Sequence, residues 1–255
     1  DPRRNTVLID IDFNTQVNAQ LNIYYDPSLH NSGNHDTGWT NANALLATDG
    51  DIASALVPSC GFVNAAVQPT AKRAEGNVVQ RGALQKNQCT IALAFGRTAT
   101  EALETANASL ARGFGAVRAE YEAGWARYVS QLPRIAKHQQ QLNMAAMVLK
   151  GLEDKTYRGA VIASPSTPWG GGPNANEPNT TGYRGVWSRD LYHVATAFDA
   201  MGDRATANRL LDYLFRVQQQ LDGSFPQNSF VDGRPIGRGV QMDQVALPLV
   251  LAYQL

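Results

Sequence analysis

The sequence carries little charge and no net charge. Charged residues make up 17% of the 255 positions, and 22 lysines and arginines balance 22 aspartates and glutamates. A surface that binds nucleic acid needs an excess of positive charge, so this balance argues against a nucleic-acid partner. The longest nearly unbroken apolar run, residues 245–253, contains Pro248 and is far shorter than the roughly 20 residues of a membrane span. Neither nucleic-acid binding nor a membrane span is therefore expected.

Cysteine is scarce as well. Cys60 and Cys89 are the two cysteines, and the sequence has no Cys-x-x-Cys motif, which argues against a zinc site or a disulfide scaffold. Two free buried thiols are the favoured interpretation, and a single bridge between them is the alternative. The four histidines have no metal-ligand spacing. No metal site and no cofactor are therefore predicted, and whether a structural calcium ion binds is left open.

A secretory signal peptide is also absent from the sequence. It opens with Asp1-Pro2-Arg3-Arg4, and no apolar segment follows. A mature chain has lost such a signal, so this absence leaves the compartment open. Hydrophobic residues make up 44% of the sequence, which is typical of a globular protein with a sizeable core rather than of a disordered one.

The first hundred residues have the pattern of β-strands. Apolar and polar residues alternate over residues 6–13 and again over residues 17–25. A period of two in two neighbouring segments predicts a β-hairpin. A third alternating segment, residues 91–95, ends at Gly96. The first part of the chain is therefore predicted to be antiparallel β-structure.

The apolar period changes to three or four near residue 100, which is the signature of amphipathic helices. A helical stretch is predicted over residues 103–132, with a break near Gly113. Further helices are predicted over residues 138–153, 189–201, 204–220 and 243–255. Ser188 and Asp203 precede two of them as the expected N-terminal caps.

A long loop rich in Pro, Gly, Asn and Thr, residues 164–183, leads into the segment with the clearest chemical pattern. Trp187, Arg189 and Asp190 fall at the first turn of the helix predicted after it. Arginine offers a fork of donors, aspartate offers acceptors, and tryptophan offers a flat apolar face. Together they match a pyranose ring, which has hydroxyls on its edge and C–H groups on its face. In the alternative interpretation, Asp190 only complements the helix dipole, Arg189 is its surface partner and Trp187 is a core residue.

Several motifs follow one another in the second half of the chain. They are LKGLEDKTY (149–157), ASPSTPWG (163–170), GYRGVWSRD (182–190), LDGSFPQN (221–228), DGRPI (232–236), QMD (241–243) and VALP (245–248). In this order they resemble glycoside hydrolase family 15, and within it the branch of bacterial glucoamylases and glucodextranases. The resemblance covers about residues 139–255, and the preceding order of β-structure and linker helices also agrees with that branch.

The resemblance implies a multi-domain fold of β and α structure. It places part of an antiparallel β-sandwich domain over residues 1–98 and linker helices over residues 99–136. Residues 137–255 are then the N-terminal part of an (α/α)6 catalytic barrel. The second half should accordingly consist almost entirely of helices and loops.

The resemblance also implies roles for four residues. In the family, the Trp-x-Arg-Asp motif lies in the subsite for the terminal sugar. Carried onto this chain, Arg189 and Asp190 are expected to hydrogen-bond the outer hydroxyls of that glucose. Trp187 is expected to wall the pocket, and Tyr183 to lie near the scissile bond.

Neither catalytic carboxylate is expected in this chain. In the family, the general acid belongs to a Trp-Glu-Glu-like motif after the Gln-Met-Asp segment, the base lies further on, and this sequence ends at Leu255 before both. Asp243 and Gln244 are therefore interpreted as a structural or outer-subsite element. Gln244 stands where many relatives have Glu. Gly237 stands where many relatives have a Trp, which predicts an altered leaving-group side of the pocket; compensation by Arg238 or a neighbour is the alternative.

From the resemblance we expect an exo-acting, inverting α-glucoside hydrolase. Its expected partner is an α-1,6 or α-1,4 glucan, oligosaccharide or polysaccharide, from whose non-reducing end it releases glucose. A secreted or periplasmic location is expected. Two alternatives stay open: a glucosyltransferase or trehalase on the same fold, and a non-catalytic carbohydrate-binding protein if the chain truly ends at Leu255.

Overall fold

The computed structural model describes residues 1–14, 16, 19–31, 35–68, 73–76, 78–165, 183–237 and 239–255. Contacts divide the described residues into two units, the first within residues 1–124 and the second within residues 125–165 and 183–255. We call the first the β unit and the second the helical unit. Most of the predicted long loop, residues 164–183, lies outside the described residues. The predicted domain boundaries at residues 98 and 136 stay a prediction.

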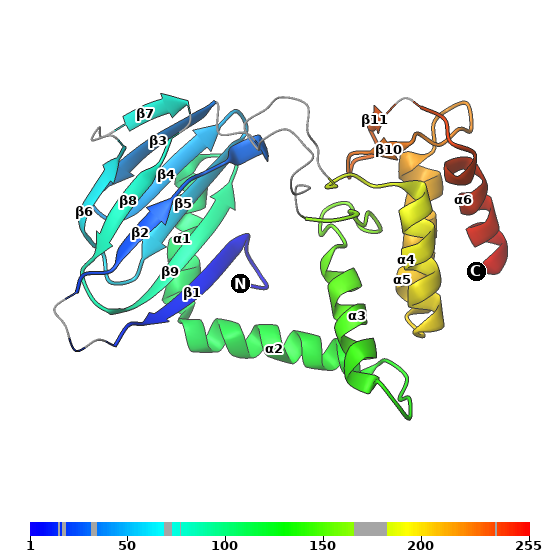
Figure 1. Cartoon of the computed structure of the whole chain (residues 1–255), viewed down its shortest axis with the longest axis horizontal. Helices are drawn as coiled ribbons and strands as arrows, with labels where there is room; N and C mark the ends of the chain where they lie inside the picture. Colours follow the sequence, from blue (N-terminus) through cyan, green and yellow to red (C-terminus); the bar gives the residue numbers. More distant parts are fainter. Residues whose placement is uncertain are drawn as a thin grey trace. The chain divides into compact units, whose positions relative to one another are not determined.

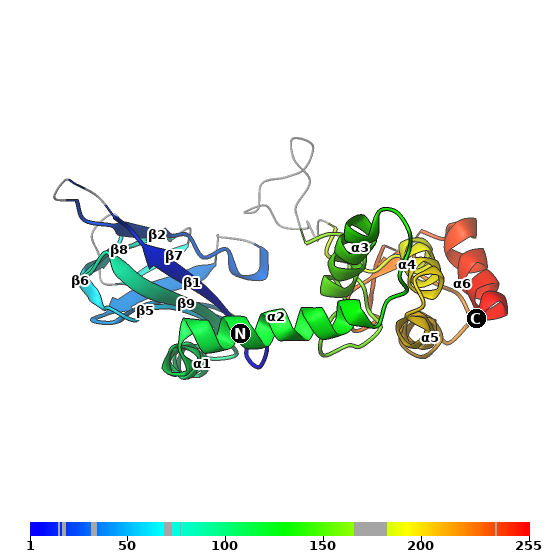
Figure 2. The same ribbon diagram turned by 90° about the horizontal axis from the view of Figure 1, so that it is seen from below.

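The β unit consists of two antiparallel sheets. The larger sheet has the strand order β1-β9-β5-β4-β3-β7, and the smaller one has the order β2-β8-β6 (Figures 1 and 2). The strands are β1 (Thr6–Asp12), β2 (Asn22–Tyr25), β3 (Asp36–Asn41), β4 (Ala44–Asp49), β5 (Ile52–Pro58), β6 (Phe62–Val67), β7 (Arg73–Gly76), β8 (Gln80–Leu84) and β9 (Gln88–Gly96). The prediction of antiparallel β-structure in this part of the chain is confirmed.

The larger sheet is covered on both faces. Leu46 and Ala55 pack into a core that the sheet shares with helix α1 (Ala99–Arg112). Leu45 and Leu56 pack instead into a core shared with the smaller sheet. Successive side chains of a strand point to opposite faces, so adjacent residues such as Leu45 and Leu46 reach different layers. The β unit is therefore a β-sandwich with a helix on its outer face (Figure 2).

The predicted hairpin between residues 6–13 and 17–25 is wrong. Strand β1 pairs with β9, with Ile9 opposite Ile91, whereas β2 pairs with β8 in the other sheet. The alternating pattern identifies which face of a strand is buried, but it does not identify the neighbouring strand. Here Leu8 of β1 packs toward α1, while Ile23 of β2 packs into the core between the sheets.

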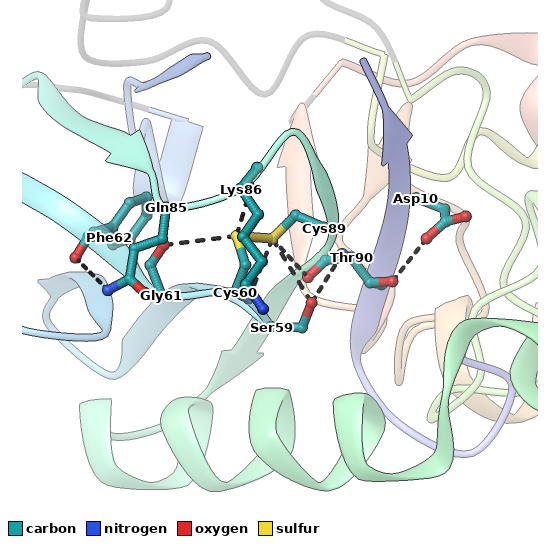
Figure 3. Close-up of a disulfide and its surroundings, with 9 residues drawn as sticks. All are labelled: Asp10, Ser59, Cys60, Gly61, Phe62, Gln85, Lys86, Cys89 and Thr90. Carbon is teal, nitrogen blue, oxygen red and sulfur yellow. Dashed lines mark hydrogen bonds between the residues drawn. A yellow bond between two sulfur atoms is a disulfide. The ribbon is translucent and has the colours of Figure 1, made fainter. Parts of the chain in front are cut away.

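A disulfide joins Cys60 to Cys89, so the interpretation of two free thiols is wrong (Figure 3). Cys60 lies in the turn after β5, and Cys89 lies in β9, with their Cα atoms 5.5 Å apart, an ordinary separation for a bridge. The Ser59 hydroxyl accepts a hydrogen bond from the Thr90 N–H at 2.9 Å, and the Thr90 hydroxyl donates to Asp10 on β1 at 2.7 Å. The bridge thus lies where β9 is joined to β1 and to the end of β5.

Loss of this bridge is expected to destabilise the β unit. Cys60 and Cys89 are 29 residues apart, and closing a loop of that length in the unfolded chain corresponds to about 3.6 kcal/mol. Urea unfolding of the β unit should therefore show a lower midpoint after reduction, and the same lower midpoint for the double variant Cys60→Ser/Cys89→Ser without reductant. An unchanged midpoint in both experiments would contradict a structural role for the bridge.

Helix α1 ends at a break, as predicted. Gly113 has a φ of 76°, in the left-handed region that glycine tolerates, and helix α2 (Phe114–Ser130) begins directly after it. Glu120 of α2 pairs with Arg112 of α1 across this break and with Arg3 of the N-terminal segment. The break is therefore an ordered corner held by ion pairs.

The helical unit contains the helices α3 (Gln139–Gly151), α4 (Ser188–Ala200), α5 (Arg204–Tyr213) and α6 (Met242–Gln254). Helix α5 continues as a π-helical turn, Leu214–Gln218, and β10 (Asn228–Ser229) pairs with β11 (Pro235–Gly237) in a short antiparallel hairpin. Helix α4 packs against α5 and α6 around Leu191, Phe198 and Leu251. The prediction of helices and loops in this half is confirmed.

An ion cluster lies beside α3 and α5. The Glu153 side chain is only 1% exposed and forms ion pairs with Arg209 at 2.9 Å and with Lys150 and Arg158 at 3.2 Å. It also accepts a hydrogen bond from the Gly159 N–H at 3.1 Å. Burial raises the pKa of Glu153, but the hydrogen bonds from Arg209 and the charge of Lys150 outweigh it and hold the pKa below its ordinary value. We call these four side chains the Glu153 cluster.

Helix α6 presents an apolar outer face. Gln244, Pro248 and Leu251 are buried, whereas Leu249 is 59% and Tyr253 is 92% exposed. Exposed apolar patches larger than a few hundred Å² usually mark association sites or an aggregation liability. We therefore expect residues 1–255, produced alone, to self-associate. Light scattering measures this association.

Changing Leu249 and Tyr253 to lysine should shift this fragment toward the monomer. The matched control is Leu221→Lys, because Leu221 is fully exposed and lies outside α6. If wild-type residues 1–255 form a monomer, or if the control reduces association equally, the outer face of α6 is not an association surface.

Candidate functional site

The segment that enters α4 is held in extended form by backbone and side-chain hydrogen bonds. The Ala163 N–H donates to the carbonyl of Gly185 at 3.1 Å. Val186 exchanges two backbone hydrogen bonds with Ser229 of β10, at 2.8 and 2.9 Å. The Gln218 side chain, at the end of the π-helical turn, donates to the Val186 carbonyl at 2.8 Å. These contacts fix the backbone immediately before Trp187.

The four residues singled out in the sequence lie along this entry and the first turn of α4. The rings of Tyr183 and Trp187 lie next to each other, with centroids 6.2 Å apart and planes tilted by 53°. Arg189 Nε lies 3.7 Å from Asp190 Oδ2, so the cation and the carboxylate are paired. Tyr183 is 49% exposed and Trp187 is half-buried. Apolar rings, donors and acceptors are thus available at one helix N-terminus.

One oxygen of Asp190 lacks a hydrogen bond. The Asp190 side chain is 42% exposed, but its Oδ2 is shielded from solvent and accepts no hydrogen bond from the described residues. A buried acceptor without a donor is costly and calls for a partner. Oδ2 itself is covered, but because the side chain is 42% exposed, the open part of the carboxylate can accept a hydrogen bond from a hydroxyl of a bound molecule.

Arg189 pairs with a second carboxylate, a contact that was not predicted from the sequence. Asp243, at the start of α6, accepts a hydrogen bond from Arg189 Nη1 at 2.8 Å. This hydrogen bond lowers the pKa of Asp243 below its ordinary value and raises that of Arg189. In the alternative interpretation, Asp190 was the surface partner of Arg189. The structure adds Asp243 as the nearer partner.

The predicted cap of α4 is wrong. Ser188 is the first residue of the helix rather than its N-cap, and the N-cap residue, Trp187, makes no side-chain capping bond. The Ser188 hydroxyl instead donates to Gln244 Oε1 at 2.5 Å, and Gln244 Oε1 also accepts from the Arg189 N–H at 2.8 Å. The cap of α5 by Asp203 is confirmed, because its side chain accepts a hydrogen bond from the Thr206 N–H.

Arg184 was not singled out from the sequence. Its Nη2 is buried and donates no hydrogen bond to any residue that the structure describes. Burial lowers the pKa of Arg184 from its ordinary value. The signal available in the sequence was an arginine directly after Tyr183. Its unpaired Nη2 adds a hydrogen-bond donor next to the entry into α4.

The described residues also line cavities away from the first turn of α4. Two cavities, of about 340 and 420 Å³, lie in the β unit; one is lined by residues including Thr40 and Phe62, and the other by residues including Asp12 and Lys86. Within the described ranges, histidine, cysteine, aspartate and glutamate form no group of three able to hold a metal ion. None of the helices in those ranges is long and apolar enough to cross a membrane.

Comparison with protein families covers both units. The model of the glucodextranase N domain matches residues 1–68 and 64–130, and that of glycosyl hydrolases family 15 matches residues 136–225. The second match includes the Trp187–Asp190 turn. The chain belongs to glycoside hydrolase family 15. Its N-terminal half corresponds to the domain that precedes the barrel in the glucodextranase branch.

Two curated proteins are similar to this family 15 chain. A glucoamylase of Clostridium sp. (strain G0005) is 33% identical over 285 aligned residues, which cover 100% of this chain and 40% of that protein. An uncharacterized glycosyl hydrolase of Methanocaldococcus jannaschii is 35% identical over 101 residues, covering 40% of this chain and 14% of that protein. The chain therefore spans well under half the length of these relatives.

Solved structures confirm the fold. The crystal structure of a bacterial glucoamylase complexed with acarbose matches 100% of this chain and 42% of its own, with a TM-score of 0.91 and 32% identity. A family GH92 α-mannosidase of Bacteroides thetaiotaomicron matches 95% of this chain and 34% of its own, with a TM-score of 0.50 at 12% identity, which shows the fold alone. The predicted fold class, an antiparallel β-sandwich followed by the first helices of an (α/α)6 barrel, is confirmed.

Proposed function

We propose that this protein is an exo-acting glycoside hydrolase that releases glucose from the non-reducing ends of α-1,6 or α-1,4 glucans with inversion. The observation that carries the proposal is the first turn of α4. There the Asp190 side chain is 42% exposed and its Oδ2 lies 3.7 Å from Arg189 Nε, beside the half-buried Trp187. Similarity to glucoamylases over all of this chain, which corresponds to 40–42% of their length, supports the same substrate class.

In the proposed mechanism, these residues bind the terminal glucose and do not carry out bond cleavage. Asp190 accepts hydrogen bonds from sugar hydroxyls, and Arg189 donates to their oxygens through the N–H groups that Asp243 leaves unused. Trp187 offers an apolar face to the C–H groups of the ring. Tyr183, next to Trp187, borders the scissile bond.

Inversion requires two carboxyl groups about 6.5–9.5 Å apart, one to protonate the leaving oxygen and one to activate water. We assign neither role to a residue of this chain. The proposal places both groups in the part of the protein that corresponds to the remaining length of the glucoamylases, of which this chain spans 40%.

The test is a product analysis with the protein as it is encoded in full. Maltose, isomaltose, dextran and trehalose are offered separately, and the anomer released is followed by NMR. Release of β-glucose from maltose, isomaltose or dextran supports the proposal. Initial release of α-glucose overturns inversion, formation of longer saccharides indicates a transferase, cleavage of trehalose alone indicates a trehalase, and binding without any product indicates a carbohydrate-binding protein.

A secreted or periplasmic location is part of the proposal. The disulfide between Cys60 and Cys89 supports it, because disulfides persist in oxidising compartments and are rare in the cytosol. Fractionation of the native host, with thiol labelling before and after reduction, tests this point. A protein found in the cytosol with both thiols reduced would contradict it.

A further inference from the structure

The first turn of α4 is capped by a residue from another helix. The first N–H groups of a helix have no partner within the helix, and a side chain just before it usually accepts their hydrogen bonds. Trp187 occupies that position and has no such side chain. Gln244, which is fully buried, accepts from the Arg189 N–H at 2.8 Å and from the Ser188 hydroxyl at 2.5 Å. Gln244 therefore replaces the missing cap from 55 residues away.

The neighbour of Gln244 fixes the other end of Arg189. Asp243 Oδ2 accepts from Arg189 Nη1 at 2.8 Å, while Asp243 Oδ1 accepts from the Gln244 N–H at 2.9 Å. The carboxylate is thus held at the start of its own helix while it holds the guanidinium. Figure 1 shows the starts of α4 and α6 at the same end of the helical unit, beside the β10–β11 hairpin.

Backbone and side chain of Arg189 are consequently fixed by two consecutive residues of α6. Of the five N–H donors of the guanidinium, Asp243 takes one on Nη1, and Nε faces Asp190 at 3.7 Å. Asp243 and Gln244, at the start of α6, therefore determine how the remaining donors of Arg189 are oriented. They also determine the orientation of the next residue, Asp190.

We propose that Gln244 and Asp243 are positioning residues, which hold Arg189 and Asp190 in the geometry that grips the terminal sugar. The proposal rests on the proposed function of Arg189 and Asp190. It adds that the start of α6 determines how tightly the first turn of α4 binds the terminal sugar. Gln244 acts through the helix backbone, whereas Asp243 acts through the guanidinium.

The test compares Gln244→Leu with a cap removal elsewhere in the same unit. Gln244→Leu puts an apolar side chain of similar size at this place and removes the acceptor. The matched control is Asp203→Ala, which removes the cap of α5 at the Thr206 N–H. In the protein as encoded in full, both variants should lower the melting temperature, but Gln244→Leu alone should lower kcat/KM, about fivefold. Gln244→Glu, which keeps an acceptor at the same place, should recover most of this loss.

Asp243 is tested in the same way. Asp243→Ala should lower kcat/KM by a similar factor, and Asp243→Asn should recover part of it, because the amide oxygen still accepts from Arg189. A loss of kcat/KM in Asp203→Ala as large as that in Gln244→Leu would overturn the positioning role, since general destabilisation then explains both.

Amide hydrogen exchange separates this proposal from the proposed function. The peptide that contains the Arg189 N–H should exchange faster in Gln244→Leu and at the wild-type rate in Asp203→Ala, whether or not the protein is active. If the wild type hydrolyses none of the four glucosides, the proposed function fails, and the dissociation constant of acarbose replaces kcat/KM. Unchanged exchange in Gln244→Leu, or an unchanged affinity, overturns the positioning proposal.

Discussion

Replacing Asp190 with asparagine is expected to lower kcat/KM by at least tenfold in the protein as encoded in full. The Asp190 side chain is 42% exposed, so the open part of its carboxylate can be reached by a sugar hydroxyl. An amide at this position loses the charge and places a donor where an acceptor is needed. A buried polar group left without its partner costs about 1–3 kcal/mol, and about 1.4 kcal/mol is a factor of ten.

The expected thermal stability of Asp190→Asn is close to that of the wild type. If Asp190 only complements the dipole of α4, the opposite result is expected: a loss of about 1 kcal/mol of stability and near-normal turnover. Melting temperature and kcat/KM measured on the same variant distinguish the two roles. A lowered melting point with unchanged kinetics would refute sugar binding by Asp190.

Asp199 provides a matched control on the same helix. It is 39% exposed and lies 3.5 Å from Arg204 Nε, whereas Asp190 is 42% exposed and lies 3.7 Å from Arg189 Nε. Asp199 lies near the C-terminal end of α4, away from the first turn. Asp199→Asn is therefore expected to leave kcat/KM unchanged. An equal loss in both variants would indicate a general effect of charge removal on α4.

The periodicity of the sequence predicted most helices and strands, but not their partners. Residues 189–201 were expected to be helical, and α4 covers Ser188–Ala200. Residues 204–220 were expected to form one α-helix, but the α-helix ends at Tyr213 and a π-helical turn follows to Gln218. The apolar period does not distinguish these two helix types, because the same face is buried in both. Strand pairing was not predicted for a related reason. The alternation of apolar and polar residues identifies the buried face of a strand but not the strand with which it pairs.

The candidate site was only partly visible in the sequence. Trp187, Arg189 and Asp190 are adjacent, so their types and spacing pointed to one helix turn. The partners Asp243 and Gln244 lie more than 50 residues further on, and nothing in the local sequence joins them to Arg189. Serine before a helix is a common cap, but the Ser188 hydroxyl faces Gln244 instead. Long-range hydrogen bonds of this kind depend on tertiary packing and are not encoded in a local pattern.

The Glu153 cluster was equally hidden, and its removal is expected to have a large effect on the stability of the helical unit. Glu153→Gln should destabilise the helical unit by about 3 kcal/mol, because it removes the buried carboxylate that pairs with Arg158 and Arg209, whereas Lys150 keeps Asp203 at 3.6 Å. Lys150, Arg158 and Arg209 all point to this one carboxylate, which is 1% exposed. Urea unfolding of the protein as encoded in full, followed by a signal from the helical unit, measures the change.

Asp212→Asn is the matched control for Glu153→Gln. Asp212 forms an ion pair with Arg216 at 3.1 Å one helical turn away, but its side chain is 62% exposed. Exposed pairs of this kind contribute about 0.5 kcal/mol or less. A loss in Glu153→Gln no larger than in this control would show that water enters the cluster and screens its charges.

The pH dependence of stability gives a second test of the same cluster. The folded-state pKa of Glu153 lies below its ordinary value, so the unfolded chain binds a proton more readily than the folded one. The stabilisation by Glu153 is therefore complete above the unfolded pKa of about 4.3, and it is lost as the pH falls through the folded pKa. The difference in unfolding free energy between wild type and Glu153→Gln should accordingly be constant near neutral pH and shrink below about pH 4. A difference that does not vary with pH would mean that the Glu153 carboxylate is not the source of the stability.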